Sequence, residues 1–182
     1  MPSVLVPVAD GTEEMEMIIL VDILRRADFD VTIASLTGEM IVASRGTKIV
    51  PDCSMEDAQA RDFDLVVLPG GMPGADHLGK DTRVQEILKK TADDGHLVGA
   101  ICAAPRVLAQ AGLLDGKRAT CYPGFLDGIS ASVASTGQAI ERDGNVITSR
   151  AAGTAVDFAL ALVEALADNQ KRDEVEKGLV RT

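Results

Sequence analysis

Cys102 is the residue of this sequence whose type and context best suit a chemical reaction. It follows an apolar run at Leu97–Ile101 and precedes Ala-Ala-Pro at residues 103–105, a pattern typical of a buried strand that turns sharply into a helix, as at a nucleophile elbow. A thiol at the start of a helix is favoured as the thiolate, its nucleophilic form. The alternative is a structural cysteine, because cysteine is among the residue types most often buried.

Two further cysteines, Cys53 and Cys121, lack this context. Their spacing fits no zinc-binding pattern, so we expect no metal site and structural or incidental roles for both. Cys121 stands beside Tyr122-Pro123, near another predicted strand end, where it could still line a pocket.

Three acidic residues, Glu13, Glu14 and Glu16, open a helix predicted over residues 13–27. Acidic side chains complement the dipole at a helix N-terminus, which explains Glu13 without any function. Glu16 differs because apolar residues surround it in the sequence, at Met15 and at positions 17–19. A carboxyl at the rim of an apolar pocket has a raised pKa. Glu16 is therefore a candidate to hydrogen-bond a thiolate or to pass a proton to a substrate.

A glycine-rich segment, Leu-Pro-Gly-Gly-Met-Pro-Gly-Ala, occupies residues 68–75. Its glycines do not follow the dinucleotide-binding order, and no phosphate-loop Gly-Lys-Ser/Thr follows. It is either a tight turn or a loop whose backbone N–H, at Gly71, donates to an oxyanion. His77 lies beyond this loop and His96 at the opposite end of its strand, so a Cys-His amidase mechanism lacks its base.

Alternating strands and helices must position these residues. Strands are predicted over residues 3–8, 30–36, 40–43, 48–50, 64–68 and 96–101, with a hairpin over 136–149, and helices over 13–27, 81–94, 103–112, 153–167 and 169–177. Apolar strands that alternate with helices indicate an α/β fold, a mostly parallel sheet with helices on both faces. In such folds ligands bind outside the carboxyl ends of the strands. The loops that carry Glu16, Gly71 and Cys102 emerge there.

The amino-acid composition argues against several classes of function. The 182 residues predict one domain over residues 1–182, with 46% hydrophobic and 25% charged residues as in globular proteins. The formal net charge of −10 opposes binding to nucleic-acid phosphates and to anionic membranes, and only 3% of residues are aromatic, which leaves no platform for stacking bases. We see no signal peptide and no membrane-spanning run, and therefore expect a cytoplasmic protein.

At these residues the sequence resembles the ThiJ/PfpI superfamily, also called the DJ-one superfamily, in its small single-domain YajL-like branch. The resemblance runs nearly end to end. Its specific segments are Leu-Pro-Gly-Gly at residues 68–71 and Ala-Ile-Cys-Ala-Ala-Pro at 100–105, and weaker ones are residues 10–16, 44–46, 148–150 and 153–154. It implies a flavodoxin-like three-layer sandwich that is usually a homodimer.

The resemblance also implies roles for individual residues. Cys102 matches the family nucleophile, Glu16 the carboxylic acid that hydrogen-bonds it, and Gly71 and Ala103 the backbone N–H donors. Arg45 matches an arginine that approaches the partner subunit's site in relatives.

Further residues are expected near the pocket or the dimer contact, namely Glu14, Gly70, Tyr122 and Arg45. Tyr122-Pro123 stands where many relatives carry His-Pro. A tyrosine is a poor base near pH 7, so Glu16 is the better candidate for a base. Ala103 stands where protease-type relatives carry His after the cysteine, which argues against protease activity.

Activities attributed to relatives are glutathione-independent glyoxalase, deglycation of methylglyoxal adducts, chaperone-like protection and oxidative-stress defence. We therefore expect a cysteine-dependent, cofactor-free enzyme that converts methylglyoxal, or its protein or nucleotide adducts, to lactate through the Cys102 thiolate. The alternative is a redox-sensing or chaperone-like protein in which Cys102 is oxidised to a sulfinate without turnover of small carbonyls.

Overall fold

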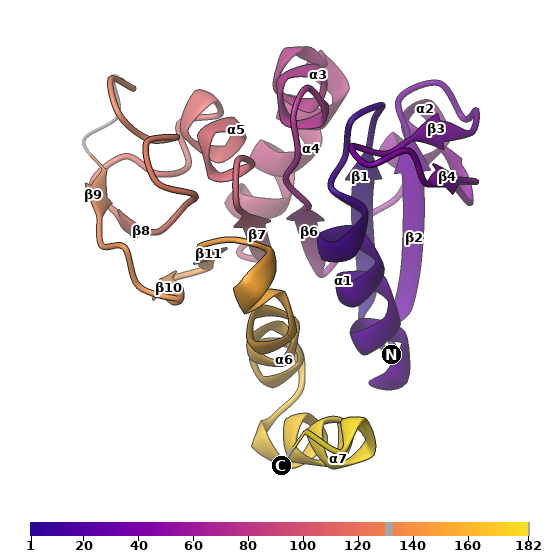
Figure 1. Ribbon diagram of the computed structural model, residues 1–182, viewed down its shortest axis with the longest axis vertical. Coiled ribbons are helices and arrows are strands. Elements are labelled where there is room, and N and C mark those ends of the chain that lie inside the picture. Colours follow the sequence, from indigo (N-terminus) through magenta and orange to yellow (C-terminus); the bar gives the residue numbers. More distant parts are fainter. Residues whose placement is uncertain (130–132, 182) are drawn as a thin grey trace.

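A seven-stranded sheet forms the centre of the computed structural model, which describes residues 1–129 and 133–181. The strand order is β10-β11-β7-β6-β1-β2-β5, and every neighbouring pair is parallel except β10 with β11 (Figure 1). These strands are β1 (Ser3–Val8), β2 (Asp30–Ser35), β5 (Cys53–Ser54), β6 (Leu65–Leu68), β7 (Leu97–Ile101), β10 (Ile140–Asp143) and β11 (Val146–Ser149). The predicted mostly parallel α/β sheet is confirmed.

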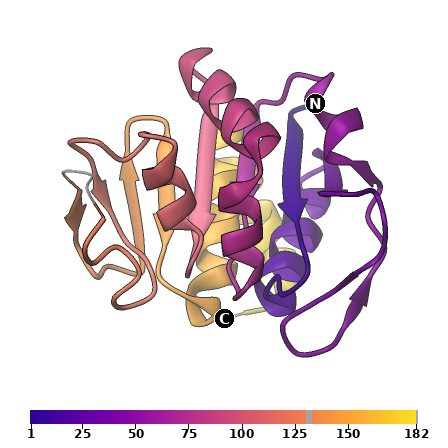
Figure 2. The same ribbon diagram turned by 90° about the horizontal axis from the view of Figure 1, so that it is seen from above.

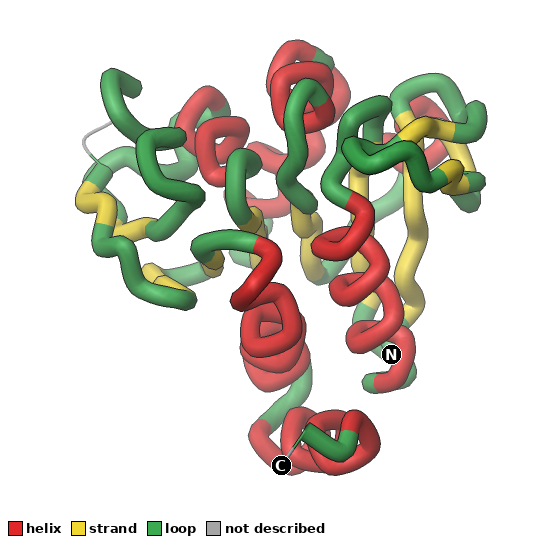
Figure 3. The backbone as a smooth tube through the Cα atoms, in the orientation of Figure 1, coloured by secondary structure: helices red, strands yellow, loops and turns green. Residues whose placement is uncertain are grey.

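Helices cover both faces of the sheet (Figures 2 and 3). They are α1 (Glu14–Arg26), α2 (Met55–Gln59), α3 (Gly74–Lys80), α4 (Thr82–Asp93), α5 (Pro105–Gln110), the short 3-10 helix η1 (Ala152–Thr154), α6 (Ala155–Leu166) and α7 (Asn169–Leu179). The helices α1 and α6 pack side by side on one face, and α3, α4 and α5 lie on the other. Two small two-stranded sheets, β3 (Ile41–Val42) with β4 (Lys48–Ile49) and β8 (Arg118–Ala119) with β9 (Ala134–Ser135), lie beside them.

The apolar runs of the sequence explain this layering. Side chains alternate along a strand, so Val4, Val6 and Val8 of β1 join the apolar core beneath α1 and α6. Leu5 points the other way and joins the core beneath the opposite helices. A strand buried on both faces needs a continuous apolar sequence, which is what β1 has.

Acidic side chains cap several helices. The Glu13 carboxylate accepts a hydrogen bond from the Glu16 N–H at 2.7 Å and begins α1, and Asp168 does the same for α7 through the Lys171 N–H at 2.8 Å. The role assigned to Glu13 from the sequence, a helix-terminal one, therefore agrees with its position. Within the described parts of the chain, no helix combines the length and apolarity needed to cross a membrane.

Some predicted bounds were wrong. The helix predicted over residues 103–112 begins only at Pro105, because residues 102–104 form the turn that leaves β7. The strands predicted over 40–43 and 48–50 shrink to two residues each. The helices α2 and α3 were not predicted; α3 contains Gly74 and Gly79, which are poor helix formers.

Candidate functional site

Three loops meet at the carboxyl ends of β1, β6 and β7. The Glu13 N–H donates to the Gly70 carbonyl at 2.9 Å and ties the loop after β1 to the loop after β6. Beside this contact a cavity of about 280 Å³ opens to solvent. Its lining residues are Glu13, Ser44, Arg45, Gly71, Met72, Cys102, Ala103, Tyr122 and Phe125.

Cys102 adopts the backbone of a nucleophile elbow. Its φ angle is 64°, in the left-handed region that non-glycine residues rarely occupy. Two hydrogen bonds hold this conformation: the Cys102 N–H donates to the Ser149 carbonyl at 3.0 Å, and the Cys102 carbonyl accepts from the Tyr122 N–H at 2.8 Å. The backbone N–H groups of Ala103 and Gly71 donate to its sulfur. Strain fixed in this way is typical of a functional site.

Ser149 supports the elbow from beneath, and its role was not predicted. Its hydroxyl donates to the Ala139 carbonyl at 2.9 Å and lies 2.7 Å from the Thr154 hydroxyl, which bonds in turn to the Ala151 backbone. These bonds fix the end of β11, where the Ser149 carbonyl accepts the hydrogen bond from the Cys102 N–H. The only sequence signal was the segment at residues 148–150 and 153–154 that contributed to the family resemblance.

Gly70 lies against both candidate catalytic side chains, Glu16 and Cys102. A Cβ atom at this position would lie 2.7 Å from Cys102 Cβ, 2.8 Å from Glu16 Oε2 and 3.0 Å from the Ala103 nitrogen. Real Cβ atoms do not approach other atoms so closely. Glycine is therefore required here for space, and its absent side chain lets Glu16 and Cys102 lie side by side.

Glu16 is completely buried, with 0% of its surface exposed. Its Oε2 accepts a hydrogen bond from the Gly70 N–H at 2.8 Å, whereas Oε1 has no hydrogen-bond partner among the described residues. Burial raises the pKa of Glu16 to about 7, although the bond from Gly70 and the Cys102 thiol both lower it. Such a carboxyl exchanges its proton near neutral pH, as a general acid or base should.

The sequence predicted that Cys102 is favoured as the thiolate, and the geometry of the site contradicts this prediction. Burial raises the pKa of the Cys102 thiol to about 12, and the neighbouring Glu16 charge raises it further than the Ala103 and Gly71 N–H groups lower it. The helix contributes little because α5 is short and begins three residues later, at Pro105. The first proton that this pair loses on raising the pH therefore leaves from Glu16.

The pair can still generate a nucleophile. When Glu16 is ionised, its carboxylate can take the thiol proton as Cys102 attacks, so that the total charge of the pair does not change. The two N–H groups of Gly71 and Ala103 then lie beside the reacting sulfur, where an oxyanion would develop. This arrangement provides a base, a nucleophile and oxyanion donors in one place.

Glu14 lies outside the cavity and anchors one of its walls. Its carboxylate accepts from the Ser44 hydroxyl at 2.9 Å and from the Arg45 N–H at 3.0 Å. Although partial burial opposes it, hydrogen bonds from the Ser44, Arg45 and Thr47 region lower the pKa of Glu14 to about 2. Glu14 thus positions the β3–β4 turn, and Arg45 on that turn lines the Cys102 cavity of its own chain.

The other residues considered from the sequence lie apart from this cavity. His77 Nδ1 lies 3.1 Å from the Asp10 carbonyl. Cys53 does not line the cavity, and neither does the buried Cys121, whose thiol donates to the Tyr122 carbonyl at 3.0 Å. In residues 1–129 and 133–181, no three His, Cys, Asp or Glu side chains are grouped to hold a metal ion.

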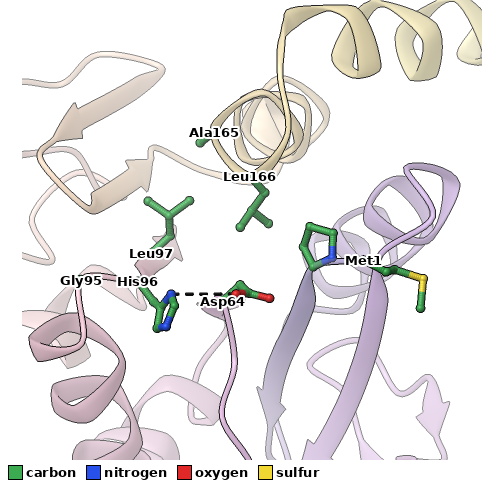
Figure 4. Close-up of a pocket in the computed structure, with 8 residues that line it drawn as sticks. Met1, Asp64, Gly95, His96, Leu97, Ala165 and Leu166 are labelled. Carbon is green, nitrogen blue, oxygen red and sulfur yellow. Dashed lines mark ion pairs between the residues drawn. The ribbon is translucent and has the colours of Figure 1, made fainter.

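His96 lies at the opposite end of the sheet, as predicted. It lines a larger cavity of about 570 Å³ with Asp64, Leu97, Leu166 and the first residues of the chain (Figure 4). His96 Nδ1 lies 3.9 Å from Asp64 Oδ1. This cavity has no Cys, Ser or Thr among its lining residues and stands at the amino ends of the strands, so we do not assign the reaction to it.

Met72, Phe125 and Ser44 line the Cys102 cavity and were missed. Turn residues carry no periodic pattern that would reveal such positions. One signal was present in the composition: the chain has one Tyr and four Phe, and one residue of each type lines this cavity.

Known proteins resemble this chain in sequence and in structure. Residues 2–165 match the DJ-1/PfpI family. Protein dj-1beta of Drosophila melanogaster is 44% identical over 180 residues, which cover 98% of this chain and 96% of that protein. The crystal structure of Drosophila melanogaster DJ-1beta superposes with a TM-score of 0.94 at 43% identity, over 100% of this chain and 98% of the other.

A second relative differs in length. Protein DJ-1 homolog B of Arabidopsis thaliana is 42% identical over 98% of this chain, but the chain spans only 41% of that protein. A further relative, 34% identical over 97% of this chain and 94% of its own length, is named glutathione-independent glyoxalase DJR-1.2 of Caenorhabditis elegans. The resemblance seen in the sequence and the flavodoxin-like sandwich are thereby confirmed, and the chain belongs to the DJ-1/PfpI family.

Proposed function

We propose that this protein is a cysteine-dependent enzyme that converts methylglyoxal, or its adducts with proteins and nucleotides, to lactate without glutathione. The observation that carries the proposal is the convergence of Cys102, Glu16 and the Gly71 and Ala103 N–H groups beside one cavity. The name of the Caenorhabditis elegans relative supports the same reaction type.

The proposed reaction begins with transfer of the thiol proton to Glu16. The Cys102 sulfur forms a bond to the aldehyde carbon, and the carbonyl electron pair moves to oxygen, where the Gly71 and Ala103 N–H groups stabilise it. Glu16 passes the thiol proton to this oxygen and is ionised again. It then moves a proton from the former aldehyde carbon to the neighbouring carbon, while the new hydroxyl proton passes to the ketone oxygen, which converts the adduct to a thioester. Water cleaves the carbon–sulfur bond and releases lactate and the thiol, so that overall methylglyoxal and water give lactate and a proton.

The direct test is lactate formation from methylglyoxal by the wild type and by Cys102→Ser, followed by an enzymatic lactate assay. We expect turnover to disappear in Cys102→Ser and to fall by a factor of about 10² or more in Glu16→Gln, the usual contribution of a general base. Lactate formation that survives Cys102→Ser would reject the proposal.

The second candidate is redox sensing or chaperone-like protection through Cys102. A solved structure of a Toxoplasma gondii relative, 34% identical with a TM-score of 0.94, is described as oxidized. That description supports redox sensing as the second candidate function. It predicts a stable Cys102 sulfinate after mild peroxide treatment and no lactate formation. Intact-mass analysis and the lactate assay on the same sample separate the two functions.

We further propose that the protein is a homodimer. Large apolar side chains are exposed on α1, at Met15 and Ile18, and on or beside the β3–β4 hairpin, at Met40, Val42 and Val50. Glu14 links these two elements through Ser44 and Arg45, so their exposed surfaces adjoin. Sedimentation of the wild type as a dimer and of Ile18→Glu as a monomer is the expected result; a monomeric wild type would reject this proposal.

A further inference from the structure

Two aromatic side chains, Tyr122 and Phe125, line the Cys102 cavity and form an aromatic wall. The Tyr122 and Phe125 rings meet edge to face, with centroids 5.8 Å apart and an interplanar angle of 90°. Met72 lines the same cavity. Tyr122 is 48% exposed and Met72 is 40% exposed, so protein atoms leave much of this apolar wall uncovered. Such a wall is unusual in a chain with no Trp and 3% aromatic residues.

The size of the cavity exceeds what methylglyoxal needs. Its five heavy atoms fill at most ~150 Å³ if each takes the ~30 Å³ of a water molecule in the liquid. The cavity measures about 280 Å³. A three-carbon carbonyl bonded to Cys102 would therefore leave about half of the space beside the aromatic wall unfilled.

The lining of this cavity combines polar groups, which include Glu13, Ser44 and Arg45, with apolar side chains. Cys102 and the N–H groups of Gly71 and Ala103 form the reacting end, and Tyr122, Phe125 and Met72 supply large apolar side chains. Ligand sites commonly combine a few polar groups that fix orientation with an apolar wall that selects shape. Aromatic side chains also contact other rings favourably when these approach edge to face.

We propose that Tyr122, Phe125 and Met72 form an apolar subsite that selects α-oxo aldehydes or adducts carrying an aromatic or bulky apolar substituent over methylglyoxal itself. That the substrate is an α-oxo aldehyde rests on the proposed function, whereas the presence of the apolar subsite rests only on the side chains that line the cavity. Tyr122 is then a specificity-determining residue, and its ring rather than its hydroxyl is what acts.

A pair of alkylating reagents tests the subsite without any turnover. Iodoacetamide and N-benzyliodoacetamide present the same carbon to the Cys102 sulfur, which displaces iodide, and they differ only by the benzyl group. The ratio of their second-order rates with Cys102, located by peptide mapping, is divided by the same ratio measured with glutathione. We expect a preference of about tenfold for the benzyl reagent, the lower end of what apolar pockets achieve.

Variants assign the preference to the wall. We expect the ratio to fall towards one in Tyr122→Ala and in Met72→Ala, and to persist in Tyr122→Phe. Val180→Ala is the matched control, because it removes an exposed apolar side chain on the C-terminal side of α7 and should leave the ratio unchanged.

A wild-type ratio equal to that of glutathione would overturn the proposal, as would a ratio that survives Tyr122→Ala or is lost in Tyr122→Phe. A second copy of the chain covering the wall would also abolish the preference and would count against the subsite. Lactate formation is measured on the same preparations. Retained preference without lactate formation would reject the proposed enzyme and leave the subsite, and lactate formation without preference would do the reverse.

Discussion

Replacing Glu16 by Gln should change the pH dependence of stability, because the folded protein raises the pKa of this buried carboxyl from 4.5 to about 7. The unfolded chain ionises Glu16 near its ordinary pKa, whereas the folded protein keeps the proton until about pH 7. The stabilisation is therefore complete below pH 4.5 and is lost as the pH rises to about 7. Each pKa unit corresponds to 1.36 kcal/mol, so the loss amounts to about 3 kcal/mol.

Glu16→Gln lacks this titration, so the wild type should lose about 3 kcal/mol relative to the variant between pH 4.5 and pH 8. Urea unfolding followed by circular dichroism, in reducing buffer, measures the difference; the chain has no Trp for fluorescence. Glu14→Gln is the control on the same helix. Hydrogen bonds lower the pKa of Glu14, so its contribution is present above pH 4.5 and is lost as the pH falls towards 2. A difference between wild type and Glu16→Gln that does not vary with pH would refute the reasoning.

Three further variants test the supports of the site. Gly70→Ala should slow Cys102 alkylation at least tenfold and lower the free energy of unfolding in urea by about 1–3 kcal/mol, because the added Cβ would meet Cys102 and Glu16. Gly178→Ala is the control, because its added Cβ meets nothing within 4 Å and should not destabilise the protein. Ser149→Ala should cost about 0.5–1.5 kcal/mol in the same assay, since it removes the hydrogen bonds of the Ser149 hydroxyl to the Ala139 carbonyl and the Thr154 hydroxyl; an unchanged midpoint would contradict the role of Ser149. Glu14→Gln should speed amide hydrogen exchange at Arg45, and equal exchange would show that Glu14 does not hold this turn.

The strong sequence patterns predicted the fold well. Continuous apolar runs such as Ser3–Val8 suit strands buried on both faces, and the turn after Leu97–Ile101 could be predicted from Ala-Ala-Pro. The short β5, Cys53–Ser54, offers too few residues for any pattern. The helix α3 was not predicted because it contains two glycines, which are poor helix formers.

The site was harder to predict because its properties depend on packing. The position of Glu16 within an apolar face indicated a raised pKa, and that prediction is confirmed. The Cys102 thiolate was predicted from a helix start alone. Burial of the thiol, together with the Glu16 charge that comes from a distant part of the sequence, raises the pKa of Cys102 instead. Met72 and Phe125 reach the cavity from turns, where only the folded chain shows which side chains meet.

The most direct test of the Cys102–Glu16 pair is the rate of Cys102 alkylation by iodoacetamide against pH, in the wild type and in Glu16→Gln. Ionised Glu16 accepts the thiol proton, so we predict a wild-type midpoint near pH 7, below the ~8.5 of a free thiol. In Glu16→Gln the midpoint should move to 8.5 or above, with a rate at pH 7 lower by a factor of about 10². Equal midpoints in the two proteins, or no labelling of folded Cys102, would contradict the pair and remove the basis of the proposed enzyme.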